Sequence, residues 1–323
     1  MRPVRRDCHD PGGLRCHRVA EAEDIMRAVL QAFGGNRLDH PSEDRRRNKS
    51  RRVKYGLAIS EEVLGDGAPV LLQGGLERAM FQARTLGFES VEMHIRNPGE
   101  FHADRILELA GNLELTVSAI GTGLEYTLNG LSFTSPDPAV RERSIQRFKE
   151  HIDLAAPLGA VVFLGLCRGR APSFAKRQET LDLLAETLVP IAAYGEKRGV
   201  VLGFEPIAMY LTNLLTTTQD TLDFLKRPGL SSLQLLLDTH HIFLEDRDLE
   251  ASFRQCRGRI AHVHISDSNR LSPGYGNVDW RRVGKVLKSI DYAGSVSLEV
   301  LPFPDSAEAA QRGLKWMRTV WGD

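Results

Sequence analysis

Four short apolar runs in the second half of the chain each end on a residue that can bind a metal ion. The runs are VVLGFE, LQLLLD, IAHVH and SVSLE, and they end on Glu205, Asp238, His264 and Glu299. Each run has the length of a strand, and helical patterns separate the runs, which predicts strand–helix units around a parallel sheet. In a closed barrel the carboxyl ends of such strands point to one spot, so we expect the four side chains to converge. One acidic residue after a strand is usually a helix cap or a loop charge, but four successive strands that end this way indicate a divalent metal site.

The same alternation begins at Val53 and predicts an α/β fold, a (β/α)8 TIM barrel, in a single domain of residues 53–323. Besides the four runs above, strands are expected at residues 53–60, 90–96, 115–121 and 160–166. Helices are expected at about residues 75–86, 103–111, 138–158, 175–198, 218–226, 249–256, 280–290 and 307–320.

Residues 1–52 differ in kind from the rest of the chain. They hold thirteen Lys or Arg against eight Asp or Glu, a net charge of +5, with Gly and Pro between short charged stretches. A basic run of this type is usually a solvated tail, although RNA and membrane contacts also use such runs. Because Val53 can be encoded by an alternative start codon, we expect residues 1–52 to be a flexible extension or a translated upstream region.

The composition excludes several classes of protein. The chain of 323 residues has 42 basic and 42 acidic residues, and this balance argues against a general affinity for nucleic acid. No apolar run approaches the roughly 18 residues that span a bilayer, and the N-terminus lacks the apolar core of a secretory signal. The cysteines at positions 8, 16, 167 and 256 have no CxxC spacing, so we expect a reduced, cytoplasmic setting.

One imidazole with three carboxylates makes a hard, oxygen-rich ligand set. Such a set favours Mn²⁺, with Mg²⁺ and Co²⁺ as alternatives. A metal of this kind can bind the carbonyl oxygen and the adjacent hydroxyl of a sugar and stabilise an enediolate. Glu205 and Glu299 could then serve as the acid–base pair. Return of the proton to the opposite face of the same carbon gives epimerisation, and return to the neighbouring carbon gives isomerisation.

The strand at 90–96 places Glu92, His94 and Arg96 on one face, because side chains alternate along a strand. The opposite face is apolar, so we expect the three polar side chains to point into the barrel, with His94 and Arg96 nearest the mouth. Both are candidates for substrate contact. The alternative for His94 is a hydrogen-bonded core residue.

Three more residues are candidates for substrate contact. Arg168 follows the strand at 160–166 and could meet an anionic group of the substrate. His241 lies three residues after Asp238, and Arg270 lies six residues after His264, from where it can reach back over the mouth. For each, a structural hydrogen bond or a solvated loop charge is the alternative.

Several motifs carry a resemblance to a known family. They are GFEP (203–206), LLDTHH (236–241), HVHISDSNR (262–270) and SLEV (297–300). From Val53 to Trp321 the chain resembles the sugar isomerase/epimerase superfamily of xylose isomerase-like barrels, which includes D-tagatose 3-epimerase, inosose dehydratase and endonuclease IV. The segments AIGTG, GLSFTSPD, GLCRGR and DSNRLSPGYGNVDW look like the 5-keto-L-gluconate epimerase branch.

The resemblance implies roles for individual residues. Glu205, Asp238, His264 and Glu299 match the metal ligands of the superfamily, and the two glutamates match its acid–base pair. His241 and Arg270 match positions that bind substrate.

The chain departs from the pattern of this branch after Glu205. The branch usually reads EPLNRYET, whereas this chain reads EPIAMYLT, so that Ala208, Met209 and Leu211 replace Asn, Arg and Glu. The replaced Glu would hold the terminal hydroxyls of the substrate. An apolar corner in its place suits a substrate with a hydrophobic or aromatic group.

Several functions therefore stay open. The first is a metal-dependent sugar or keto-sugar epimerase or isomerase, which we expect to be a homo-oligomer. The second is a lyase that uses the same enolisation, either a C-glycoside deglycosidase catalytic subunit with a small partner subunit or an inosose-dehydratase-like enzyme. The third is a non-catalytic sugar-binding barrel. A nuclease of the endonuclease IV type would need more His ligands and a basic face for DNA.

Overall fold

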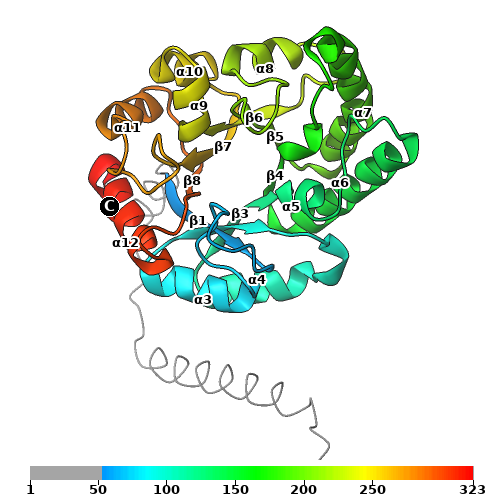
Figure 1. The fold of residues 1–323 in the computed structure, drawn as a ribbon. Helices are drawn as coiled ribbons and strands as arrows, with labels where there is room; N and C mark the ends of the chain where they lie inside the picture. Colours follow the sequence, from blue (N-terminus) through cyan, green and yellow to red (C-terminus); the bar gives the residue numbers. More distant parts are fainter. Residues whose placement is uncertain (1–52, 323) are drawn as a thin grey trace, which may run out of the picture. The chain divides into compact units, whose positions relative to one another are not determined.

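A closed barrel of eight parallel strands forms the centre of the protein (Figure 1). The computed structural model describes residues 53–322, so the extension expected at residues 1–52 lies outside the described residues. The strands are β1 (Lys54–Ser60), β2 (Ser90–His94), β3 (Thr116–Gly121), β4 (Val161–Leu164), β5 (Leu202–Phe204), β6 (Gln234–Asp238), β7 (Ile260–Ile265) and β8 (Ser295–Leu298). Each strand pairs with its neighbours in chain order, and β8 closes onto β1. The expected (β/α)8 barrel is confirmed.

Helices connect consecutive strands and form a ring around the barrel (Figure 1). They are α3 (Leu76–Leu86), α4 (Ala103–Asn112), α5 (Gly123–Thr127), α6 (Pro138–Leu158), α7 (Arg177–Arg198), α8 (Thr218–Phe224), α9 (Thr239–Glu245), α10 (Leu249–Gln255), α11 (Trp280–Ser289) and α12 (Ser306–Trp321), with 3₁₀ turns η1 (Pro98–Glu100), η2 (Leu166–Arg168) and η3 (Phe174–Lys176). Asp137, Asp279 and Asp305 cap α6, α11 and α12, because each carboxylate accepts from backbone N–H groups of the first turn. Within the described residues, none of these helices has the length and hydrophobicity of a membrane span.

The apolar core lies in two places. Most of it fills the layer between strands and helices, where Val91 and Met93 of β2 are fully buried. A small separate cluster of Ala119, Phe163 and Leu236 lies apart from that layer. The alternation expected in β2 is confirmed at Glu92, because this side chain reaches histidines of β7, a strand that is not its neighbour. Glu92 therefore points into the barrel.

Strand β2 is shorter than expected, and this changes the place of Arg96. The strand ends at His94 rather than at Arg96, because Asn97 and Pro98 begin the turn η1, where the Asn97 side chain accepts from the N–H of Gly99. Arg96 therefore lies outside the strand, and its exposed guanidinium bonds to Asn129 and Glu62. The expectation that it points into the barrel is wrong.

The short helices α5 and α9 directly follow β3 and β6 and were not expected. Asp238 caps the N-terminus of α9, because its Oδ1 accepts from the N–H of His240 at 2.8 Å. The sequence THHIFLE is too short for a helical period to be recognised.

Candidate metal centre

The four expected ligands meet at the carboxyl ends of β5 to β8. Glu205, Asp238, His264 and Glu299 are buried, and one ligand atom from each lies within 4.8 Å of the others. His264 Nδ1 lies 3.1 Å from an oxygen of Glu299 and 3.6 Å from oxygens of Glu205 and Asp238. The strand ends thus bring together the residues that the sequence singled out.

These residues fit a divalent cation. Nδ1 of His264 is buried and has no hydrogen-bond partner, which is rare for a buried polar atom. Three carboxylates face this nitrogen, and the single positive charge of Arg270, which pairs with Asp238 and Glu299, does not balance all three. A nitrogen lone pair and three anionic oxygens are ligands that Mn²⁺, Mg²⁺ or Co²⁺ accepts.

The carboxylate of Glu92 lies next to this group and contacts three imidazoles. Its Oε2 is 2.8 Å from His262 Nε2 and 2.9 Å from His264 Nε2, and its Oε1 is 2.9 Å from His94 Nε2. Burial opposes the ionisation of Glu92, but the imidazoles outweigh it and hold the pKa of this carboxyl well below its usual range. Sequence analysis placed Glu92 in the barrel without giving it a role, since two of its partners, His262 and His264, lie about 170 residues away in the chain.

The two glutamates of the ligand set have different electrostatic environments. Burial raises the pKa of Glu205. Burial also disfavours the ionised form of Glu299, but Arg270 and His264 outweigh it and lower the pKa of that carboxyl. Such a difference is characteristic of an acid–base pair.

Arg270 reaches over the site as expected. Its guanidinium donates to both Asp238 and Glu299. The residue adopts a left-handed backbone with φ of 63°, which is uncommon for a side chain of this size. Two backbone hydrogen bonds hold it, from the Arg270 N–H to Asp267 O at 2.9 Å and from the Leu301 N–H to Arg270 O at 2.8 Å.

His241 lies on α9 at the edge of the ligand set. Its Nε2 is 4.0 Å from Glu205 Oε1, and its Nδ1 accepts from the N–H of Ala208 at 3.4 Å. Burial lowers the pKa of His241 to about 3, so the ring is neutral at pH 7. His94 also reaches the site, because its Nε2 lies 3.7 Å from Glu299 Oε1 and its ring contacts Phe163 edge to face.

Arg168 takes a different place from the one expected. The side chain is fully buried, and its guanidinium donates to the backbone carbonyls of Leu164, Gly165, Glu205, Leu214 and Leu215. It also stacks on the ring of Phe204, 4.2 Å from its centroid. With its donors used inside the protein, Arg168 holds the backbone beside Glu205 instead of facing a substrate.

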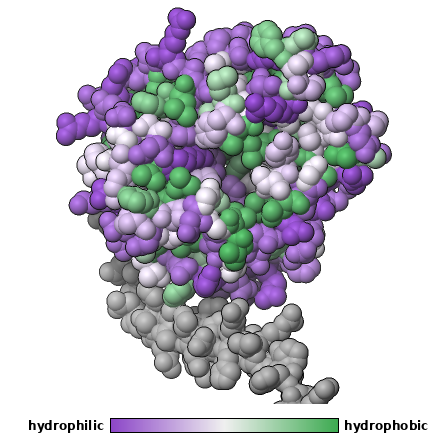
Figure 2. Space-filling model, in the orientation of Figure 1, coloured by the Kyte–Doolittle hydropathy of each residue, from purple (hydrophilic) through white to green (hydrophobic). Residues whose placement is uncertain are grey.

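An apolar wall follows Glu205 at the mouth. Met209 is 65% exposed, Tyr210 57% and Leu211 41%. The Tyr210 hydroxyl lies 3.0 Å from His240 Nε2, and its ring centroid is 6.3 Å from that of His241. Figure 2 shows hydrophobic residues grouped around the central hollow of this face. Tyr210 was not singled out from the sequence, because the branch pattern has a Tyr there as well.

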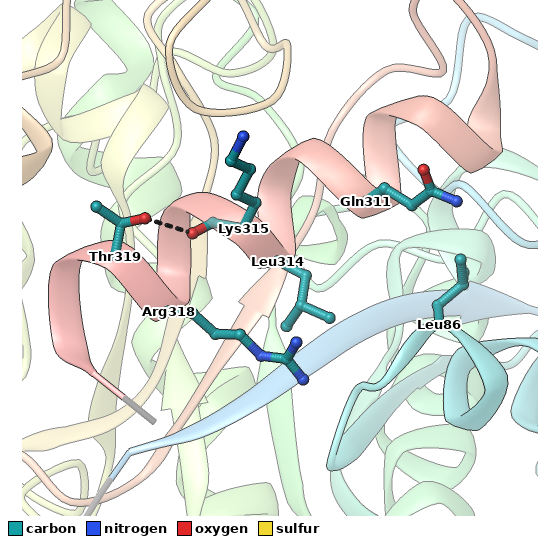
Figure 3. A pocket seen from close by; sticks show the side chains of 6 residues that line it. All are labelled: Leu86, Gln311, Leu314, Lys315, Arg318 and Thr319. Atoms are coloured by element: carbon teal, nitrogen blue, oxygen red, sulfur yellow. Dashed lines mark hydrogen bonds between the residues drawn. The ribbon is translucent and has the colours of Figure 1, made fainter.

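A second hollow lies on the outer helices, between the end of α3 and α12 (Figure 3). Its lining residues are Leu86, Gln311, Leu314, Lys315, Arg318 and Thr319. None of these is a carboxylate or an imidazole, so this hollow lacks the chemistry of the ligand set.

Comparison with known proteins agrees with the barrel fold. Residues 81–320 match the xylose isomerase-like TIM barrel family. The chain is 27% identical to L-ribulose 3-epimerase of Mesorhizobium japonicum over 257 residues, which cover 78% of this chain and 84% of the relative. It is also 27% identical to 3-dehydro-D-guloside 4-epimerase of Escherichia coli, over 138 residues that cover 42% of this chain and 53% of that protein.

Solved structures share the fold. A structure of L-ribulose 3-epimerase superimposes with a TM-score of 0.69 at 24% identity and covers 83% of this chain and 94% of its own. The E. coli 3-keto-D-glucoside 4-epimerase superimposes with a TM-score of 0.70 at 17% identity, over 83% of this chain and all of its own.

Proposed function

The chain belongs to the xylose isomerase-like TIM barrel family, and we propose that it is a divalent-metal-dependent epimerase or isomerase of ketoses or keto-sugars. One observation carries the proposal. Two buried glutamates, Glu205 and Glu299, lie with Asp238 and His264 in one group whose possible ligand atoms are all within 4.8 Å of one another. The relatives named L-ribulose 3-epimerase and 3-dehydro-D-guloside 4-epimerase support the same class of reaction.

Glu205, Asp238, His264 and Glu299 would hold the metal. When bound, it would supply positive charge that stabilises the negative charge developing on the carbonyl oxygen when the proton of the adjacent carbon is removed. Of the candidate ions, we propose Mn²⁺, because three carboxylates and one imidazole form a mainly oxygen-rich set.

Glu299 acts as the base in one direction of the reaction. Arg270 and His264 favour its ionised form, so it can take the proton from the carbon next to the carbonyl. Glu205 follows a different strand, β5, and burial raises its pKa, which suits the group that returns a proton to the other face of that carbon. The net change is inversion of one centre, and the reverse reaction exchanges the two roles.

Arg270, His241 and His94 surround the place where the substrate oxygens would lie. Arg270 offers a cation, and the neutral ring of His241, whose Nδ1 accepts from Ala208, can donate from Nε2 to an oxygen of the substrate. The side chain of His94, beside Glu299, is the third contact that we propose.

Metal content and proton exchange test this function together. Purified protein should contain one equivalent of a divalent metal, and it should exchange a C–H proton of a ketose or keto-sugar with D₂O. Asp238→Asn should lose both the metal and the exchange. Glu125→Gln, a change at a buried glutamate on α5, is the matched control and should keep both. Wild-type protein with no metal and no exchange would support the sugar-binding barrel instead.

The apolar wall of Met209, Tyr210 and Leu211 favours a second candidate function. A lyase acting on a 3-keto glycoside would use the same base to form an enolate, and the aglycone would then leave with the bonding electrons. An aromatic aglycone could lie against this wall. Release of free aglycone from a 3-keto C-glycoside, with or without a small partner subunit, would establish the lyase. Exchange on free ketoses without any such release would exclude it.

A further inference from the structure

We propose that Glu92 is a positioning residue that fixes the ring tautomers of His264 and His94 and thereby sets the metal affinity of the site. The inference rests on the proposed metal function. It goes beyond the ligand set of Glu205, Asp238, His264 and Glu299, to which Glu92 does not belong. Glu92 lies in two other groups of possible ligands, but both of its oxygens are occupied by imidazole nitrogens at 2.8–2.9 Å. The evidence is its contact with two site histidines through two different oxygens.

The first contact determines which nitrogen of His264 is free. An ionised carboxylate can only accept hydrogen bonds. At 2.9 Å from Glu92 Oε2, Nε2 of His264 must therefore carry the proton. With Nε2 protonated, the ring can bind a metal only through Nδ1, the atom that faces Glu205, Asp238 and Glu299. Carboxylates that hold a metal-binding imidazole in this way orient the ring and make it a stronger ligand.

The second contact connects the same carboxylate to His94. Glu92 Oε1 lies 2.9 Å from His94 Nε2, which is itself 3.7 Å from Glu299 Oε1. The carboxylate of Glu92 thus contacts both the ring of His264, a proposed metal ligand, and the ring of His94, which lies beside the proposed base Glu299. A change at Glu92 should affect both the metal and the substrate side of the site.

A second buried Glu–His pair in the chain provides a control. Glu125 Oε1 lies 2.8 Å from His151 Nε2, and both side chains are fully buried. Nδ1 of His151 also lacks a partner, as Nδ1 of His264 does. No group of possible metal ligands in the described residues includes Glu125 or His151. Loss of this pair should therefore cost stability without affecting metal binding.

The test is a Mn²⁺ titration of the full chain, with free Mn²⁺ measured by electron paramagnetic resonance. Glu92→Met keeps the approximate length of the side chain and removes every acceptor, so we expect the Kd to rise by about 10- to 100-fold. Glu92→Gln keeps one acceptor oxygen and should give a smaller rise. Glu125→Gln should bind Mn²⁺ like the wild type.

A measurement on the wild-type protein tests the inference even if the Glu92 variants fail to fold. Spectra of the Mg²⁺-loaded, ¹⁵N-histidine-labelled protein should show His264 with its proton on Nε2, assigned by the signal that His264→Asn removes. A proton on Nδ1 of His264, or an unchanged Kd in Glu92→Met, would overturn the inference and leave the metal site in place. A wild-type chain that binds no Mn²⁺ would overturn the proposed function and the inference together.

Discussion

The two sides of the candidate site, near β5 and near β8, differ in chemistry. On the β8 side, Glu299 lies among charged and polar partners, with Arg270 donating to it and His264 at 3.1 Å. On the β5 side, Glu205 is followed by the exposed apolar side chains of Met209 and Leu211. Burial acts on both carboxylates, but only for Glu299 do Arg270 and His264 outweigh it, so that the pKa of Glu299 is lowered and that of Glu205 is raised. A pair of identical residues thus acquires different proton affinities from its surroundings.

The two arginines show the same difference. Arg270 faces carboxylates, which outweigh its burial and raise its pKa. Arg168 faces neutral carbonyls, and burial lowers its pKa to about 9. The guanidinium on the β8 side contacts carboxylates of the candidate site, whereas the guanidinium on the β5 side contacts backbone carbonyls. Changes at the two sides should therefore have distinct effects.

The largest effect is expected from Glu299→Gln. An amide cannot take a proton, so proton exchange between substrate and D₂O should fall by about 10²- to 10⁴-fold, the usual contribution of a general base. The measurement is deuterium incorporation at a fixed, saturating concentration of metal. Exchange at the wild-type rate in this variant would remove Glu299 from the acid–base pair.

Arg270→Met tests whether the charge on the β8 side orients the substrate. Loss of a guanidinium that meets anionic or polar groups should lower kcat/KM by about 10- to 100-fold, from the roughly 1.5–3 kcal/mol of a charged hydrogen bond. Arg270→Lys keeps the charge and should recover part of the loss. The measurement is steady-state kinetics on a substrate identified by the D₂O exchange experiment. If both variants lose kcat/KM equally, the shape of the arginine side chain matters and not its charge.

Leu211→Glu tests the apolar side. This change restores the polar residue that the branch pattern has at this position, so turnover of small ketoses should rise by about tenfold, as for one added hydrogen bond to a charged group. Activity on substrates with an aromatic group should fall in the same variant. If neither activity changes, Leu211 does not contact the substrate.

The smallest effect is expected from Asp267→Asn, in the loop that carries Arg270. The Asp267 carboxylate accepts from the N–H groups of Gly274 and Val278 and from Trp280 Nε1, and these bonds outweigh burial and lower its pKa. An amide has only one acceptor oxygen, so the free energy of unfolding should fall by about 1–2 kcal/mol at pH 7.

The pH dependence of this difference follows from the direction of the pKa shift. A carboxyl with a lowered folded-state pKa stabilises the protein above its unfolded pKa of about 3.9, and this contribution is lost as the pH falls through the folded pKa. Urea unfolding of wild type and variant should be measured at pH 7 and below pH 4. The difference between their free energies of unfolding should be smaller at the acidic pH. If this difference in free energy of unfolding is the same at both pH values, the ionisation of Asp267 does not stabilise the loop.

The barrel and the ligand set could be predicted because both follow from local patterns. Alternating strand and helix signals define the eight units, and each ligand residue lies at or directly after a strand end, as at Asp238 and Glu299. Since parallel strands of a closed barrel end at the same face, sequence positions alone place these side chains together. The short helices α5 and α9 lack enough residues for such a pattern.

What the sequence by itself determined is therefore the barrel and the residues that gather at its mouth. Only the tertiary structure decided which partner each charged side chain has. Arg168 and Arg270 look alike in the sequence, but one is surrounded by carbonyls and the other by carboxylates. Glu92 meets histidines about 170 residues away. Hydrogen-bond partners across a barrel are set by the closure of the sheet, and no local pattern contains that information.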